Sequence, residues 1–168
     1  MELSQAIELI RSDEFDKDTI ATWADLGCGS GLFTNALLSY LHPKSTVYAV
    51  DQYPVKINHP SVILKQMDFI KEDWDFLGPL DGILMANSLH FVEDKPSFLR
   101  KVKAALKPNG TLLLVEYDTD TPNHWVPFPA SFSSLKRILL EARFKNVHRL
   151  QEQPSIYGKA NIYASWIN

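Results

Sequence analysis

The residues with the clearest chemical meaning are three glycines at alternate positions, Gly27, Gly29 and Gly31, which closely follow Asp25. They stand between a β-prone segment over 19–24 and a helix-prone segment over 32–40. A turn without side chains lets a ligand approach the backbone, and the N-terminus of the following helix adds free N–H groups and a positive dipole end. The pattern predicts a strand, a turn and a helix that together bind a polar or anionic cofactor group.

The spacing of the glycines distinguishes between classes of cofactor. The dinucleotide fingerprint places its third glycine three positions after the second, where this chain has Leu32. A phosphate-binding P-loop needs Lys followed by Ser or Thr after the last glycine, and this chain has Leu32 and Phe33. Both nucleotide-phosphate interpretations are weakened, although a dinucleotide, or a glycine turn without any ligand, stays open as an alternative.

The run from Asp25 to Gly31, Asp-Leu-Gly-Cys-Gly-Ser-Gly, resembles motif I of class I S-adenosylmethionine-dependent methyltransferases. In that family the acid and the glycine backbone hold the amino-acid end of the cofactor, which carries an ammonium and a carboxylate instead of a diphosphate. The resemblance implies S-adenosyl-L-methionine as methyl donor and S-adenosyl-L-homocysteine as product. It assigns cofactor binding to Asp25, Gly27, Cys28, Gly29 and Gly31. Cys28 itself is expected to be an inert packing residue between two glycines.

A second acid is expected at the end of the second strand, about 20 residues beyond the turn, where it would bind the ribose hydroxyls. The β-branched run over 46–50 ends in Asp51, which fits this role, and Gln52 would then lie near the adenine. The alternative is that Asp51 only caps the turn that precedes Pro54.

Asp68 and Phe69 follow a third strand expected over 62–67. In the methyltransferase family an Asp at this place commonly accepts a hydrogen bond from the adenine amino group, and its neighbour packs on the ring. The alternative is that Asp68 is the N-cap of the next helix.

The fourth strand, over 82–86, is apolar without alternation, as expected for a strand buried on both faces. Polar residues follow at its carboxyl end, where open α/β sheets bind ligands. We expect Asn87 and Ser88 to form part of the cofactor wall. The run from Asn87 to His90, Asn-Ser-Leu-His, resembles the small-molecule, type 11-like branch of the family. It departs from the Asp/Asn-Pro-Pro-aromatic run of nucleic-acid amino-methylating enzymes.

Methyl transfer from a sulfonium needs a base only if the acceptor must lose a proton. The candidate catalytic residues are His90, Tyr117 and His124, with His90 the first choice and a purely structural hydrogen bond its alternative. The loop over 117–130 is expected to roof the substrate pocket. Alternatively, Trp125 and Phe128 only pin this loop to the core.

Strands and helices alternate along the chain, which predicts an α/β fold with a parallel sheet covered by helices on both faces. The resemblance implies a Rossmann-like, doubly wound, seven-stranded sheet of order 3-2-1-4-5-7-6, mostly parallel with the last strand antiparallel, in a three-layer α/β/α sandwich. No full helix is expected between Asp51 and Ser61, because Pro54 and Pro60 interrupt that segment. A hairpin is expected around 155–159. The expected helices cover 3–11, 32–40, 69–76, 95–106 and 132–143, and the expected strands cover 22–25, 46–51, 62–67, 82–85, 111–117, 147–152 and 161–167.

The length predicts a single domain over residues 1–168. The resemblance implies that this is an S-adenosylmethionine-binding methyltransferase domain, with little or no N-terminal cap. The chain has 168 residues, of which 45% are hydrophobic and 22% charged, which is ordinary for a soluble globular protein. Its net charge of -3 argues only weakly against a nucleic-acid partner. The sequence contains no apolar run that could span a membrane and no signal peptide, so we expect a cytoplasmic protein. A single cysteine, Cys28, excludes a cysteine-based metal site, and we expect no metal.

The expected activity is methyl transfer by in-line displacement to an oxygen, nitrogen or carbon acceptor, on a small-molecule substrate. The alternative function is a catalytically weak, methyltransferase-like binding or partner subunit. A homodimer stays open as the assembly.

Overall fold

The computed structural model describes residues 1–155 and 160–168. Its elements follow the expected alternation of strands and helices. In chain order they are α1 (Leu3–Leu9), β1 (Thr22–Leu26), α2 (Leu32–Leu38), β2 (Thr46–Asp51), β3 (Val62–Gln66), β4 (Leu80–Ala86), the 3-10 helix η1 (Leu89–Phe91), α3 (Lys95–Ala105), β5 (Leu106–Tyr117), α4 (Phe132–Glu141), β6 (Val147–Pro154) and β7 (Asn161–Ile167).

The seven strands form one sheet of order β3-β2-β1-β4-β5-β7-β6, which confirms the predicted α/β fold. The pairs from β3 to β5 are parallel, and β7 runs antiparallel between β5 and β6. β6 and β7 form the antiparallel pair of the expected hairpin, and residues 156–159 between them lie outside the described part of the chain. The carboxyl ends of β1, β2 and β4 therefore meet at one edge of the sheet.

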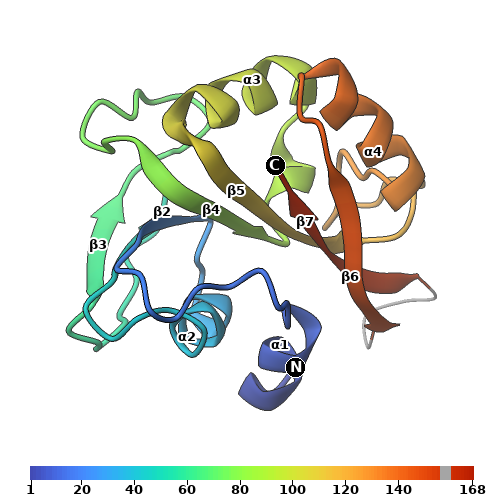
Figure 1. Cartoon of the computed structure of the whole chain (residues 1–168). Helices are drawn as coiled ribbons and strands as arrows, with labels where there is room; N and C mark the ends of the chain where they lie inside the picture. The colour runs from blue at the N-terminus through green and yellow to red at the C-terminus, as the bar shows by residue number, and fades with distance from the viewer. Residues whose placement is uncertain (156–159) are drawn as a thin grey trace.

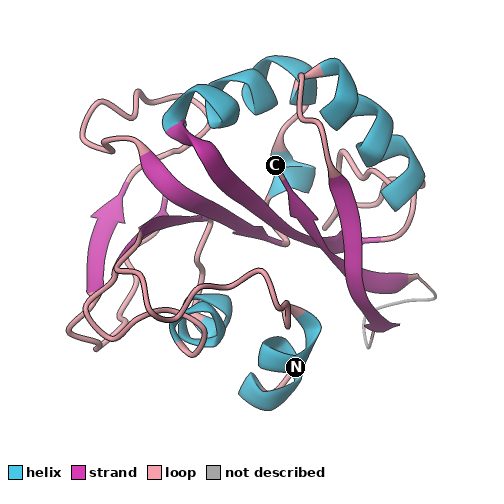
Figure 2. Cartoon of the chain, in the orientation of Figure 1, coloured by secondary structure: helices cyan, strands magenta, loops and turns pink. Residues whose placement is uncertain are grey.

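Helices cover the two faces of the sheet in pairs (Figures 1 and 2). α1 and α2 lie on one face, and α3 and α4 lie on the other. Each face has its own apolar core, because successive side chains of a strand point to opposite faces. In β1, Ala24 and Leu26 belong to the core under α3, whereas Trp23 belongs to the core under α2. Asp25 therefore points toward α2.

The prediction of a helix over 69–76 is wrong, because the chain forms turns there. Asp68 does begin a helical turn, since its Oδ1 accepts the backbone N–H of Ile70 at 3.0 Å. The carbonyl of Phe69, which would accept from the amide four residues later in a helix, instead accepts the indole N–H of Trp74 at 3.0 Å. This side-chain bond takes the acceptor that a second helical turn requires.

The segment between β2 and β3 has no helix, as predicted. β3 lies at the edge of the sheet, and its consecutive residues Ile63 and Leu64 are 42% and 41% exposed. Because neighbouring strand residues point to opposite faces, both faces of β3 are only partly covered.

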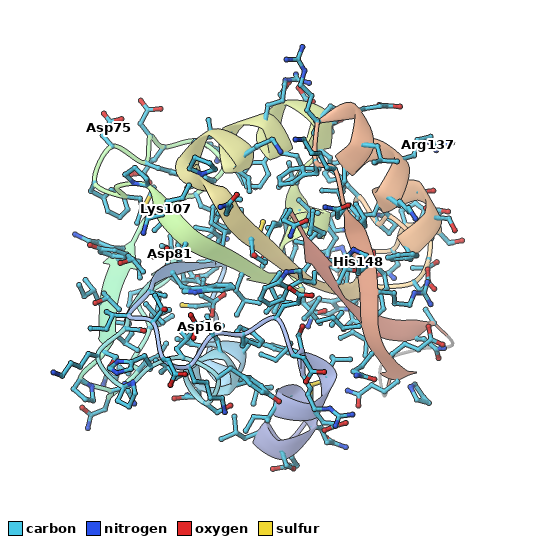
Figure 3. All side chains as sticks on the ribbon, viewed as in Figure 1. Asp16, Asp75, Asp81, Lys107, Arg137 and His148 are labelled. Atoms are coloured by element: carbon cyan, nitrogen blue, oxygen red, sulfur yellow. The ribbon has the colours of Figure 1, made fainter. Side chains whose placement is uncertain are left out.

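β5 begins five residues earlier than the expected 111. Leu106 pairs with Leu80 and Thr111 with Gly82, so residues 107–110 are inserted as an irregularity within the strand. Lys107 fixes this insertion: its Nζ lies 2.7 Å from Asp81 Oδ1, and both residues are labelled in Figure 3. The described part of the chain contains no helix long and apolar enough to cross a membrane.

Candidate functional site

The main cavity lies beside the carboxyl ends of β1, β2 and β4 and has a volume of about 1000 Å³. Ten of the eleven residues predicted to bind the cofactor line it. The eleventh, Gly31, is the N-cap of α2 in a left-handed conformation with φ 83°. The ten lining residues are Asp25, Gly27, Cys28, Gly29, Asp51, Gln52, Asp68, Phe69, Asn87 and Ser88.

The glycine turn is fixed from two sides. The backbone N–H groups of Gly27 and Cys28 donate to the carbonyl of Val50 in β2, at 2.8 and 3.0 Å. From the segment after β4, the Ser88 hydroxyl donates to the carbonyl of Leu26 at 2.6 Å. Gly27 has φ +83°, and a Cβ there would lie 2.6 Å from Ser88 Cβ. Ser88 therefore holds the turn in place with its hydroxyl.

Asp25 carries an unpartnered acceptor at the cavity. Its carboxyl is fully buried, Oδ2 accepts the Thr34 hydroxyl at 2.6 Å, and Oδ1 has no hydrogen-bond partner. Burial raises the pKa of Asp25 to about 7, the Thr34 hydrogen bond lowers it, and the charge of Asp51 raises it. A cationic donor at this place would supply the missing partner and restore the ionised form.

Asp25 gives the first prediction, on pH-dependent stability. Since its folded-state pKa of about 7 lies above the ordinary aspartate value of 3.8, the folded chain keeps a proton on Asp25 between these pH values, whereas the unfolded chain loses it. The contribution of Asp25 to the free energy of unfolding is therefore full below pH 4 and is lost as pH rises toward 7. We expect Asp25→Asn to remove this pH dependence. Between pH 4 and pH 8 the free energy of unfolding of the variant should therefore rise, relative to that of wild type, by several kcal/mol (about 1.4 kcal/mol per pKa unit).

Urea unfolding of both proteins from pH 4 to pH 8 measures this difference. Other acids, such as Asp94 and Asp120, have a lowered pKa because hydrogen bonds with Ser97 and Ser131 stabilise their ionised forms, so they make both proteins more stable as pH rises. This shared trend cancels when the free energy of unfolding of wild type is subtracted from that of the variant at each pH. A stability difference that does not change with pH would contradict the assignment.

Asp51 accepts two backbone N–H groups. Oδ2 accepts from Gly29 at 2.9 Å, and Oδ1 accepts from Tyr53 at 3.0 Å. Asp51 thus caps the turn before Pro54, as in its alternative role, and it also lines the cavity beside the glycines.

Asp68 and Phe69 form another part of the wall. Asp68 Oδ1 accepts from Ile70 at 3.0 Å and Lys71 at 3.3 Å, and Oδ2 lies 3.0 Å from Lys71 Nζ. This capping pattern matches the alternative for Asp68, except that the following segment is a turn. The Phe69 ring meets Phe98 of α3 edge to face, with centroids 5.8 Å apart.

Asn87 follows β4 in a left-handed conformation with φ 53°. Its backbone N–H donates to Val115 at 2.8 Å, while its buried Oδ1 has no partner. A non-glycine residue with positive φ at a strand end is a strained conformation that is often found at functional sites. Asn87 and Asp25 thus both line the cavity, and each has a buried side-chain oxygen without a partner.

The three candidate catalytic residues lie elsewhere among the described residues. His90 is 4% exposed and lies outside the lining of the main cavity. Its Nδ1 lies 2.7 Å from Glu116 Oε2, and its backbone N–H donates to Oε1 at 3.1 Å. Tyr117 and His124 line a second cavity of about 940 Å³. The catalytic roles of all three residues stay predictions. His90 does make the structural hydrogen bond that was its alternative role.

The loop after β5 reaches both cavities. Trp125 lines the second cavity and is 78% exposed, so it does not pin the loop to the core. Phe128 lines the main cavity and is 37% exposed. Its backbone N–H donates to the carbonyl of His90 at 3.0 Å.

Sequence reasoning missed Glu116 and the contribution of α3 to the site. Glu116 is a lone acid in the buried run of β5, which is a signal for a specific partner. α3 brings Ser97, Phe98 and Lys101 to the cavity, and Lys101 Nζ lies 4.4 Å from the centroid of the Trp74 ring. The first turn of this helix follows the carboxyl end of β4, so its contact with the site follows from the topology.

Cys28 is buried in the turn. Burial raises the pKa of its thiol to about 12, and the charges of Asp25 and Asp51 add to this effect. The protonated thiol is a poor nucleophile, consistent with a packing role. Among residues 1–155 and 160–168, no group of three or more His, Cys, Asp and Glu side chains could hold a metal ion.

Residues 3–155 match the family model described as a methyltransferase domain. No curated protein matches the chain. Many solved structures share the fold, among them the Burkholderia thailandensis 1,6-didemethyltoxoflavin-N1-methyltransferase with its substrate and S-adenosylhomocysteine bound. The TM-score with that protein is 0.69 at 19% identity, and the match covers 98% of this chain and 76% of the other.

Two further structures extend this comparison. A S-adenosylmethionine-dependent methyltransferase from Leishmania major matches with TM-score 0.67 and 20% identity over 88% of this chain and 65% of its own. Human N-acetylserotonin methyltransferase, in complex with S-adenosylmethionine, matches with TM-score 0.61 and 16% identity over 86% of this chain and 47% of its own. At these identities the likeness shows the fold, and this chain covers only about half of several matched chains, 51%, 47% and 54% of three of them.

Proposed function

Because the chain belongs to the methyltransferase domain family, we propose that it transfers a methyl group from S-adenosyl-L-methionine to a small-molecule acceptor. Structures of the same fold bear the names of methyltransferases for small molecules, including 1,6-didemethyltoxoflavin and N-acetylserotonin. The net charge of -3 gives no electrostatic support to a nucleic-acid acceptor.

One observation in this chain carries the proposal: Asp25 lines the main cavity at the glycine turn, and its buried Oδ1 has no hydrogen-bond partner. A buried carboxylate oxygen without a partner is costly, so it calls for a donor that the chain does not supply. The ammonium group of S-adenosylmethionine is such a donor. A diphosphate would be repelled by the same carboxylate, which argues against a dinucleotide.

The neighbouring residues fit the remaining parts of this cofactor. Gly29, with φ +51° and open space where a Cβ would lie, allows close approach to its backbone. Asp51 would accept hydrogen bonds from the ribose hydroxyls, while Asp68, Phe69 and Gln52 would surround the adenine. When bound, the cofactor supplies a methyl group already activated on a sulfonium, and S-adenosyl-L-homocysteine remains after transfer. The chain's task is then alignment and exclusion of water.

Isothermal titration calorimetry with S-adenosylhomocysteine tests the cofactor assignment. We expect binding with one site and a Kd in the micromolar range or tighter, and no heat with NAD at the same concentration. Binding of NAD without binding of S-adenosylhomocysteine would overturn the proposal. A transfer assay with radiolabelled S-adenosylmethionine on metabolite, protein and RNA pools then tests the acceptor class, with label expected in the metabolite pool.

A second candidate function is a catalytically weak, cofactor-binding partner subunit. It is favoured by one observation, that all three candidate bases lie outside the lining of the main cavity formed by the described residues. Good binding of S-adenosylhomocysteine together with no labelled product in any pool would favour this second function over the first.

A further inference from the structure

Lys95 has the wrong charge for its place in the fold. It is the first residue of α3, where the helix dipole presents its positive end. Lys95 is only 5% exposed, and a buried ammonium group is costly unless polar groups surround it. Neither helix formation nor apolar packing explains a lysine here, so the reason must lie in its specific partners.

Those partners belong to the wall of the main cavity. Lys95 Nζ donates to the carbonyl of Val92 at 2.8 Å and to the carbonyl of Phe128 in the loop after β5. The same nitrogen lies 5.9 Å from the centroid of the Phe128 ring. Val92 and Phe128 both line the main cavity. One buried side chain therefore joins the segment after β4 to the loop after β5 at the cavity.

Phe128 has a second polar anchor next to the first. Its backbone N–H donates to the carbonyl of His90 at 3.0 Å, and His90 is fixed by two contacts with the buried Glu116. Burial lowers the pKa of Lys95, and the negative charge of Glu116 raises it. Phe128 itself is 37% exposed and lines the main cavity.

We propose that Lys95 is a positioning residue that fixes Phe128 as the acceptor-side wall of the main cavity, so that Phe128 determines which acceptors fit. Phe91, 51% exposed, lines the same cavity, so this wall offers two aromatic side chains to a flat apolar part of the acceptor. The cofactor contacts assigned above come from residues in or after β1, β2, β3 and β4, whereas Phe128 lies in the loop after β5. The inference rests on the proposed function, because it takes the rest of the cavity as the cofactor site.

Hydrogen exchange measured by mass spectrometry tests the anchoring. In Lys95→Met we expect the amides of residues 118–131 to exchange at least about tenfold faster, equivalent to about 1.4 kcal/mol of lost local stability. Amides of residues 24–38, in the glycine turn and α2, should be unchanged. Lys103→Met is the matched control, because Lys103 is on the same helix and lies over the Phe144 ring, away from the cavity lining.

The specificity role is tested with 2-naphthol as a flat, uncharged probe, added to protein saturated with S-adenosylhomocysteine. Phe128→Ala and Lys95→Met should each raise the Kd of the probe by about five- to tenfold. The double variant should raise the Kd little further, because both changes remove the same contact between Phe128 and the probe. Phe76→Ala, an exposed Phe outside the main cavity, should leave this Kd unchanged.

The outcomes separate this inference from the proposed function. If wild type does not bind S-adenosylhomocysteine, the proposed function fails. If binding is retained but exchange over 118–131 is unchanged in Lys95→Met, or the effects of the two single variants on probe binding add fully, the positioning role is wrong. If Lys95→Met does not fold, Lys95→Gln takes its place. We then expect smaller increases in the exchange rate over 118–131 and in the Kd of the probe.

Discussion

Replacing Asp51 by Ala should lower the affinity for S-adenosylhomocysteine by at least about 100-fold, because hydrogen bonds to a charged group contribute about 1.5–3 kcal/mol each and the variant loses the acceptors for two ribose hydroxyls. The same change removes the acceptor of the Gly29 N–H, which Asp51 Oδ2 holds at 2.9 Å. The loss thus combines missing ligand contacts with a less fixed glycine turn. Calorimetric titration of wild type and variant measures the change.

Two further variants make this result specific. Asp51→Asn keeps a carbonyl acceptor but no charge, so its affinity should fall between wild type and Asp51→Ala. Asp13→Ala removes an exposed acid outside the cavity lining and should leave the affinity unchanged. Undiminished binding in Asp51→Ala, with the thermal transition intact, would show that the ribose does not lie at Asp51.

Gly27→Ala should reduce the free energy of unfolding by about 2–5 kcal/mol, the sum of about 1–2 for a left-handed alanine and 1–3 for overpacking. The φ of Gly27 is +83°, and the new Cβ would lie 2.6 Å from Ser88 Cβ. Ser88 cannot move away without releasing its hydrogen bond to the Leu26 carbonyl. Chemical denaturation measures the stability, and we expect binding of S-adenosylhomocysteine to be lost with the turn.

Other glycines of the chain provide matched controls. Gly29→Ala carries the conformational cost at φ +51° but places its Cβ in open space, so we expect about 1–2 kcal/mol of destabilisation. Gly78→Ala has open space and no positive φ, and its effect should be within about 0.5 kcal/mol of zero. If Gly27→Ala is no more destabilising than Gly29→Ala, the packing of Ser88 against the turn does not constrain position 27.

Much of the fold was predictable because its signals are local. The apolar run before Asn87 and the β-branched run before Asp51 indicate buried parallel strands, and the glycine turn marks the passage from β1 to α2. The strand order was implied by the family resemblance, since no local pattern contains it. The helix expected over 69–76 does not form because tertiary packing opposes it. The Trp74 indole is buried against α3, and its N–H donates to the carbonyl of Phe69.

The cofactor side of the site was predictable for a related reason. In a parallel sheet the carboxyl ends of neighbouring strands meet, so residues that follow separate strands in the sequence gather at one edge. Asp25 is the second-last residue of β1, Asp51 ends β2, and Asp68 and Asn87 follow β3 and β4. All four line the main cavity. Their expected contacts with the cofactor remain predictions.

By itself the sequence determined the family-like glycine turn, the acids at the strand ends and the alternation that makes an α/β sheet, because each of these depends on residues close together in the chain. Only the tertiary structure decided which side chains already have partners. It buries His90 against Glu116 on β5, leaves Asp25 Oδ1 without a donor and joins Lys95 to Phe128, 33 residues away. Such pairings depend on which segments the sheet brings together and on the cost of burying a polar group unpaired, and neither can be seen in a run of residues.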